Sequence, residues 1–204
     1  MTDRIIWVDV ETDRLDERTG VLLEVAVLVT EADLTPVDEG VSVTIHVPDS
    51  QMAGMSTTVR DMHTRNGLLE DVRRSPLRLP ECQVLVLDYV AQHVPKFDRK
   101  SKTGAPLGGS NIKFDRRWIN RHMPRFAEHP HYRDICVSTL KETVSRYFPE
   151  VHASAPRKNY AHRAMDDVHE SIAEYHSYLS GLGASLPPLA VDMNTGRLMS
   201  PAVE

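Results

Sequence analysis

The chain has few of the residues that define several large protein classes. Its 204 residues include two cysteines, Cys82 and Cys136, which do not form a C-x-x-C pair. A thiolate zinc site or a disulfide framework is therefore not expected. No apolar run approaches membrane-spanning length, and the first residues, MTDRII, lack the basic and apolar regions of a signal peptide. These absences predict a protein of the reducing cytoplasm with no membrane partner.

Aromatic residues are also scarce, at 6%, and the formal net charge is −5. Both features argue against a long, sequence-independent nucleic-acid groove, which needs cations and stacking rings. The charge is uneven, because residues 113–163 hold eleven Lys and Arg against five Asp and Glu, so the rest of the chain carries −11. This distribution suits a compact phosphate-bearing ligand, with metal ions neutralising the carboxylates. Chance clustering on solvated helix faces would explain it equally well.

The stretch that organises the chain lies near its start. An apolar run from Ile5 to Val8 ends in two carboxylates, Asp9 and Glu11. Side chains alternate along a strand, so these two project to the same side. Their mutual repulsion becomes useful if a divalent cation lies between them, because hard cations such as Mg²⁺ or Mn²⁺ prefer carboxylate oxygens. Many strands end in a solvated D-x-E, so further ligands must come from elsewhere in the chain.

The remaining pattern predicts an α/β fold around a mixed sheet. Three strands with short connections are expected at 4–10, 21–30 and 41–46, and they favour an antiparallel start. Helices are expected within 51–66 and over 82–94, 115–123 and 138–147, the last capped by Ser138 or Thr139. Loops are expected at 96–106 and 152–160, and short strands at 107–112 and 135–137. Apolar residues from Met165 to Leu179 recur at helical spacing. We expect one domain over 1–182 and an extended or disordered tail over 183–204.

Three further residues join the first two carboxylates. Asp115 follows Asn111 at a turn into a helix, and Asp167 lies at the start of the last helix, five residues after His162. Each has an ordinary explanation, since acidic residues in a first helical turn interact favourably with the helix dipole. The distinctive feature is the order of the three patterns: D-x-E on the first strand, N-x-x-x-D midway and H-x-x-x-x-D near the end.

In these motifs the sequence resembles the DEDDh 3′→5′ exonucleases and, within them, the oligoribonucleases. The matching segments are WVDVE (7–11), HYRDICVSTLKE (131–142) and HRAMDDVHESI (162–172), and similarity runs from about residue 4 to 180. The resemblance implies a ribonuclease-H-like fold, two divalent cations (Mg²⁺ or Mn²⁺) and a homodimer. It implies four metal-site carboxylates and a general base, namely Asp9, Glu11, Asp115, Asp167 and His162. Spacing does not separate Asp166 from Asp167, but the family motif favours Asp167.

The same resemblance implies residues that contact the substrate. Leu15 would wedge against the bases, and Tyr132 would reach into the partner subunit's site. The terminal phosphate and sugar would be held by His63, Arg133, Ser138 and Thr139. We also count Asn111 among the predicted substrate-binding residues. The predicted function is a metal-dependent 3′→5′ exoribonuclease that cuts short single-stranded RNA, or DNA, into nucleoside 5′-monophosphates.

Two alternatives stay open at this point. A DNA-directed or longer-substrate exonuclease of the same superfamily is favoured by Arg14, where the family usually has Gly, and by Ser110-Asn111, which reverses the usual Asn-Ser. An inactive nucleic-acid-binding module is the more distant alternative. The full set of four carboxylates and a histidine argues against it, because a binding module has no need for crowded like charges.

Overall fold

The computed structural model describes residues 3–159 and 161–200; the ends of the predicted domain and tail, at 1–2 and 201–204, lie outside the described residues. Five strands form one mixed sheet in the order β3-β2-β1-β4-β5. Their bounds are β1 Arg4–Thr12, β2 Leu22–Glu31, β3 Val41–Thr44, β4 Leu107–Gly109 and β5 Asp134–Cys136. β1, β2 and β3 are antiparallel, whereas β4 and β5 run parallel to β1. The predicted mixed α/β sheet is therefore confirmed.

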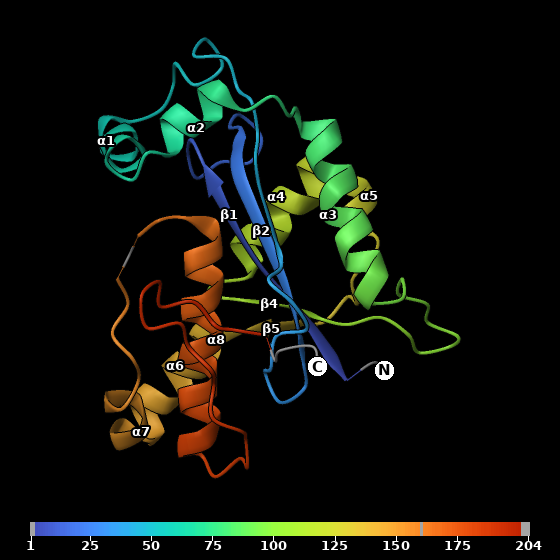
Figure 1. The fold of residues 1–204 in the computed structure, drawn as a ribbon, viewed down its shortest axis with the longest axis vertical. Helices are drawn as coiled ribbons and strands as arrows, with labels where there is room; N and C mark the ends of the chain where they lie inside the picture. The colour runs from blue at the N-terminus through green and yellow to red at the C-terminus, as the bar shows by residue number, and fades with distance from the viewer. Residues whose placement is uncertain (1–2, 160, 201–204) are drawn as a thin grey trace.

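Helices lie along both faces of this sheet (Figure 1). Their bounds are α1 Thr57–Arg65, α2 Leu68–Arg74, α3 Leu79–His93, α4 Lys113–His122, α5 Pro124–Ala127, α6 Val137–Tyr147, α7 Pro149–Ala153 and α8 Ala164–Gly181. No helix among the described residues is long and apolar enough to cross a membrane.

The alternation of side chains along β1 builds two hydrophobic cores. Ile6, Val8 and Val10 face the core shared with α2, α3, α4 and α5. Ile5 and Trp7 face the opposite core, which is shared with α6 and α8. Because Asp9 and Glu11 continue the odd-numbered series, they project on the α8 side of the sheet. The period of two thus carries the acidic pair towards the helix that supplies Asp167.

β4 is shorter than the sequence predicts. Only Leu107–Gly109 pairs with its neighbours, and Asn111 turns the chain with a φ of +52°. Gly109 allows the close approach of β4 to β1, since a Cβ there would lie 2.8 Å from the carbonyl oxygen of Val8. The early end of β4 makes room for α4, whose first turn carries Asp115.

The predicted cap of α6 and the predicted start of the loop at 152–160 differ from the structure. The hydroxyl groups of Ser138 and Thr139 do not cap α6, which begins at Val137 without a side-chain cap. The Ser138 hydroxyl instead accepts a hydrogen bond from the backbone N–H of Asn111, at 2.9 Å. A short helix, α7, begins at Pro149, where proline is well tolerated because a first-turn N–H needs no partner in the helix.

The last described residues lie against α8. Leu198 is buried in the core that contains Trp7, and its backbone N–H donates to Nδ1 of His169, at 3.1 Å. The Arg197 guanidinium forms an ion pair with Asp166, at 2.9 Å. The division into a domain over 1–182 and a tail over 183–204 stays a prediction.

Candidate active site

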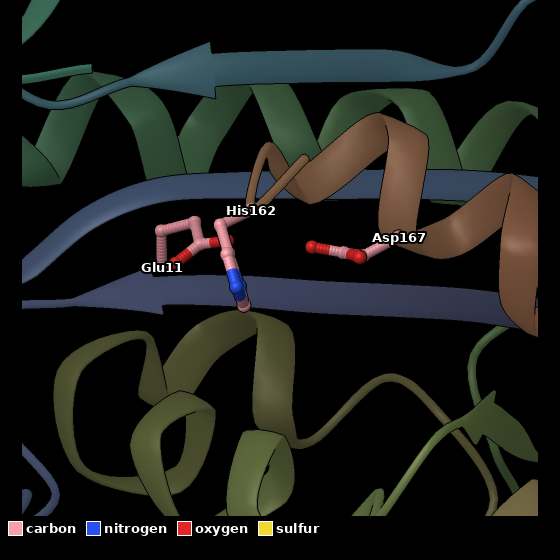
Figure 2. A group of neighbouring side chains, drawn as sticks. All are labelled: Glu11, His162 and Asp167. Atoms are coloured by element: carbon pink, nitrogen blue, oxygen red, sulfur yellow. The ribbon is translucent and has the colours of Figure 1, made fainter. Parts of the chain in front are cut away.

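The predicted acidic residues gather where β1 ends and α8 begins. Ligand atoms of Glu11, His162 and Asp167 all lie within 4.8 Å of one another. Figure 2 shows these three side chains in one space beside β1, with Asp167 reaching in from the first turn of α8. Asp9 is half-buried on the same face of β1 as Glu11. The end of one strand and the start of one helix therefore supply most of the cluster.

Asp115 comes from the other side of β1. Its Oδ1 accepts a hydrogen bond from the backbone N–H of Val10, at 3.1 Å. β4 pairs with β1 only at Ile6 and Trp7, so the edge of β1 beyond them needs another acceptor. The carboxylate of Asp115 supplies it, and this bond holds a nearly fully buried acid beside the D-x-E pair.

The electrostatics of the cluster are those of crowded, desolvated acids. Burial, followed by the carboxylates of Asp167 and Glu24, raises the pKa of Glu11 to about 8. Burial likewise raises the pKa of Asp115 to about 8 and that of Asp167 to about 6. The pKa of Asp9 is raised by burial first and then by its carboxylate neighbours. Ionised together, these groups repel one another in a poorly solvated space.

The cations nearest to this cluster, Arg163 and Lys158, lower the pKa values of Glu11 and Asp167 only through space. Neither Lys nor Arg in the described part of the chain forms a salt bridge with any of the four acids, although Arg163 lies close by. Its guanidinium is already engaged by Glu24, at 2.8 Å, and by Asp71, at 3.0 Å. Oxygen ligands in excess, with a histidine beside them, are a donor set that fits hard divalent cations. The residues present therefore fit the metal ions that the resemblance implies.

His162 is held in an unusual backbone conformation. Its φ is +52°, in the left-handed region that residues other than glycine rarely adopt. The residue immediately after it, Arg163, is fixed by Glu24, and the backbone N–H of Ala164 also donates to Glu24, at 2.9 Å. Glu24 faces Glu11 across the β1–β2 ladder. The strand that carries the acids thus also anchors the loop that carries the histidine.

The predicted substrate contacts fall into two groups. His63 is fully buried, with Nε2 3.1 Å from the carbonyl oxygen of Thr12 and 3.8 Å from a carboxylate oxygen of Glu11. Leu15 follows β1 and is 80% exposed, as a wedge would require. Asn111 and Ser138 meet through their hydrogen bond, with Thr139 next in α6. These residues lie near the carboxyl ends of the parallel strands.

Tyr132 and Arg133 are placed elsewhere. They come just before β5, and Asp134 is level with Leu107, which is level with Ile6. Glu11 lies five residues beyond Ile6, which is roughly 16 Å at about 3.3 Å per strand residue. The structure therefore does not bring Tyr132 or Arg133 to the acid cluster of their own chain.

Sequence reasoning missed Glu24 and Asn66, which hold the loop around His162. Glu24 is the one charge within the apolar run 21–30, and a lone acid in a buried strand is a usable signal. The Asn66 side chain donates to the carbonyl oxygens of Ala161 and His162. Its distance along the chain from His162 gave no signal at all.

The mixed sheet and the cluster of buried acids beside a histidine are those expected of an exonuclease. Comparison with known proteins gives the same class. The Exonuclease family model (RNase_T) matches residues 6–175, so the chain belongs to this family. Within it, the chain is similar to oligoribonucleases. It is 44% identical over 178 residues to that of Mycobacterium sp. (strain KMS) and 41% identical to that of Mycobacterium tuberculosis (strain ATCC 25177 / H37Ra). Each match covers 87% of this chain and 80% of the relative.

Solved structures support the fold. Escherichia coli exonuclease I in complex with a dT13 oligonucleotide has a TM-score of 0.64 at 15% identity, over 88% of this chain and 41% of that one. Schizosaccharomyces pombe Pop2p, in its Mg²⁺- and Mn²⁺-bound form, has a TM-score of 0.64 at 6% identity, over 86% and 82% of the two chains. The predicted ribonuclease-H-like exonuclease fold is therefore confirmed.

Proposed function

We propose that the protein is a metal-dependent 3′→5′ exoribonuclease that hydrolyses short oligoribonucleotides to nucleoside 5′-monophosphates. The observation that carries this proposal is the meeting of Glu11, His162 and Asp167 ligand atoms within 4.8 Å, in a site where carboxylates outnumber nearby cations. Membership of the exonuclease family and the 41–44% identity to oligoribonucleases support the same activity and substrate class.

The site residues divide the chemistry between them. Asp9, Glu11, Asp115 and Asp167 would hold two divalent cations, Mg²⁺ or Mn²⁺. Such cations, when bound, supply a nucleophilic water at neutral pH and stabilise the charge of the reacting phosphate. His162 accepts the proton of the attacking water, because histidine is the side chain most often used for general acid–base catalysis. The bond from phosphorus to the 3′ oxygen breaks, leaving a nucleoside 5′-monophosphate and a shortened strand with a 3′-hydroxyl.

Substrate contacts follow the same division. Leu15, exposed beyond the end of β1, packs against the bases, while His63, Asn111, Ser138 and Thr139 line the approach to the acids. Tyr132 and Arg133 lie too far from the acids of their own chain, so we propose that they serve the site of a partner subunit in a homodimer. A cytoplasmic location is part of the same proposal.

Neither alternative gains support from the structure. Arg14, which favoured a DNA-directed enzyme, donates to the buried Asp13 through Nε and Nη2, at 2.8 and 2.7 Å. Its guanidinium also packs over Gly54, where a Cβ would lie 2.5 Å from Nη2. These contacts occupy Arg14 in the fold of the loop. An inactive binding module would have no use for four acids brought together at such an electrostatic cost.

The direct test uses purified protein with Mn²⁺ and end-labelled RNA and single-stranded DNA of several lengths. We expect nucleoside 5′-monophosphates to be released stepwise from the 3′ end of short RNA, and excess EDTA to abolish the release. Undiminished cleavage in excess chelator would refute metal-dependent hydrolysis. Endonucleolytic products would refute the exonuclease assignment for this chain.

A further inference from the structure

A pocket of about 460 Å³ lies beside Tyr132, away from the acid cluster. It is lined by residues from the loop before β4 and from the segment before β5, namely Phe97, Arg99, Lys102, His131, Tyr132 and Arg133. Figure 1 shows the loop before β4 as a projection on the far side of the sheet from the start of α8. The loop corresponds to the one predicted at 96–106, and the proposed active site uses neither Arg99 nor Lys102.

The chemistry of the pocket is that of cations beside aromatic rings. His131 and Tyr132 stack with ring centroids 4.3 Å apart, and Tyr132 is 59% exposed. Arg133 lies over the Tyr132 ring, with its guanidinium carbon 5.6 Å from the centroid. In the described chain, Arg99, Lys102 and Arg133 have no carboxylate within salt-bridge distance. Three cations without a counterion, next to an exposed ring, form a site for a phosphate attached to a nucleoside.

No acid of the described residues forms an ion pair with the cations of this pocket. Asp98 accepts hydrogen bonds from the backbone N–H groups of Lys100 and Ser101 and from the Ser101 hydroxyl, which orients its carboxylate within its own loop. Asp134 is bound by the Arg116 guanidinium. The positive charge of the pocket therefore remains available to a ligand in a protein whose net charge is negative.

We propose that Arg99 and Lys102 bind a phosphate of the substrate strand other than the scissile one. The inference rests on the proposed function and on the proposed homodimer, because the pocket serves the strand that the partner's acids hold. The scissile phosphate belongs at the partner's carboxylate cluster, because the acids of the same chain lie roughly 16 Å along the strand direction from the level of Asp134. The pocket thus adds one contact for short strands that carry a second phosphate.

The test compares two substrates that differ in the number of their phosphates. A dinucleoside monophosphate carries the scissile phosphate alone, whereas a trinucleoside diphosphate carries one more. The double variant Arg99→Ala/Lys102→Ala should raise KM for the first cleavage of the trinucleotide by about fivefold or more, as expected for one lost charge-assisted contact. KM for the dinucleotide should be unchanged.

A matched control removes equal charge from the same loop outside the pocket. Lys96→Ala/Lys100→Ala should leave both KM values within twofold of the parent. Equal loss in the two double variants, or an equal rise of KM for both substrates, would overturn the proposal in favour of general electrostatic attraction. Failure of the parent protein to cleave either substrate would instead refute the proposed function.

A second, independent observation concerns the loop that carries His162. Asn66, the residue that ends α1, donates from Nδ2 to the carbonyl oxygens of Ala161, at 3.2 Å, and His162, at 2.5 Å. Its Oδ1 accepts from the backbone N–H of Leu68, at 3.1 Å, so the orientation of the amide is fixed at both ends. Asn66 also lines, with His162, a cavity of about 460 Å³.

The geometry points to Asn66 as a positioning residue for His162. A histidine at a φ of +52° needs surrounding contacts to keep it there. The Asn66 amide holds the carbonyl oxygen of His162 and that of the preceding residue, Ala161. In the proposed mechanism Asn66 touches no reacting atom. It acts by placing the imidazole of His162. This inference rests on the proposed role of His162 as general base.

The test is a double-mutant cycle. Asn66→Ala should lower kcat by about tenfold, as a small displacement of a catalytic group does, while KM and the melting temperature change little. In a His162→Ala background, the same change should lower kcat no further. Thr64→Ala, which removes an exposed hydroxyl of α1, is the control and should match the parent.

Two outcomes would overturn this inference. One is an unchanged kcat in Asn66→Ala, and the other is an equal, additive loss in the His162→Ala background, which indicates a role separate from the histidine. Full activity of His162→Ala itself would refute the proposed base rather than the role of Asn66.

Discussion

At the scale of single residues, the defining feature is an acid that is costly to bury and is buried nonetheless. Asp115 is 3% exposed, accepts the Val10 N–H and lies beside other carboxylates. A buried, uncompensated charge destabilises a fold unless it is paired or coordinates a metal. The cost therefore supports the proposal that these residues bind metal ions and do not serve stability.

Asp115→Asn separates the two roles. The amide oxygen can still accept the Val10 N–H, but the negative ligand is lost. We expect kcat/KM with Mn²⁺ to fall by more than about 100-fold, because even the outer partners of metal ligands contribute 10–100-fold. The melting temperature in EDTA should be unchanged or higher, since one of several repelling charges is gone. A variant that melts well below the parent would mean that Asp115 is structural; Asp33→Asn, in an exposed turn, is the control.

As the proposed general base, His162 should affect kcat and not substrate affinity. General-base catalysis contributes about 10²–10⁴-fold, so His162→Ala should lower kcat by that range. Substrate binding, measured by anisotropy with a labelled dinucleotide, should persist. A loss of kcat below about threefold would transfer the role of base to another group.

At the scale of elements, the end of β1 and the start of α8 form one electrostatic unit. Raised pKa values mean that the folded protein binds more protons than the unfolded chain near neutral pH. Stability from these groups is therefore fully present below their unfolded pKa, near 4, and is lost as the pH rises through about 6 for Asp167 and about 8 for Glu11. Buried His169, whose pKa is lowered to about 4, opposes this trend only below the ordinary histidine pKa of about 6.5.

The resulting prediction applies to metal-free protein between pH 6.5 and 8.5. In EDTA, the free energy of unfolding should fall across this range, by up to about 1.4 kcal/mol per pH unit for each proton released, and urea denaturation measures it. Glu11→Gln should flatten the slope. A free energy of unfolding that rises with pH over this interval would contradict the electrostatic account.

How much of each element could be predicted depended on how local its causes were. β1 could be predicted from its apolar run and α8 from the helical spacing of its apolar residues. The alternation that places Asp9 and Glu11 on one face follows from the strand alone. The short β4 and the absent α6 cap did not, because the Ser138 hydroxyl bonds to Asn111, 27 residues away. Separating Asp167 from Asp166 likewise needed a family motif at first. In the structure, Asp166 pairs with Arg197 while Asp167 reaches the cluster.

At the scale of the whole molecule, the proposed metal ligands and the residues proposed to serve the partner lie at different ends of the sheet. The acids lie near the end of β1, whereas Tyr132 and Arg133 lie before the start of β5, and the parallel register fixes this separation. Because strand pairing fixes this separation, a local movement within one chain cannot bring Tyr132 to the acids of that chain. A second copy of the chain is the simplest supplier of a tyrosine to each site.

We therefore predict a homodimer in solution. Multi-angle light scattering at working enzyme concentration should give about twice the chain mass of 23.0 kDa. Mixing an Asp115→Asn variant with a Tyr132→Ala variant should restore part of the activity, because a mixed dimer has one intact site. A monomer mass together with full activity would refute the dimer.

The proposed preference of the enzyme for short RNA is measured most directly by a competition between a short and a long substrate. The chain has few aromatic residues and a net negative charge. A short substrate engages few phosphates, so binding should depend only weakly on salt. A diribonucleotide and a 20-mer of RNA or single-stranded DNA would be offered together to limiting enzyme with Mn²⁺. The account predicts a higher kcat/KM for the diribonucleotide, falling as strands lengthen beyond a few nucleotides; faster degradation of the 20-mer per enzyme would contradict it.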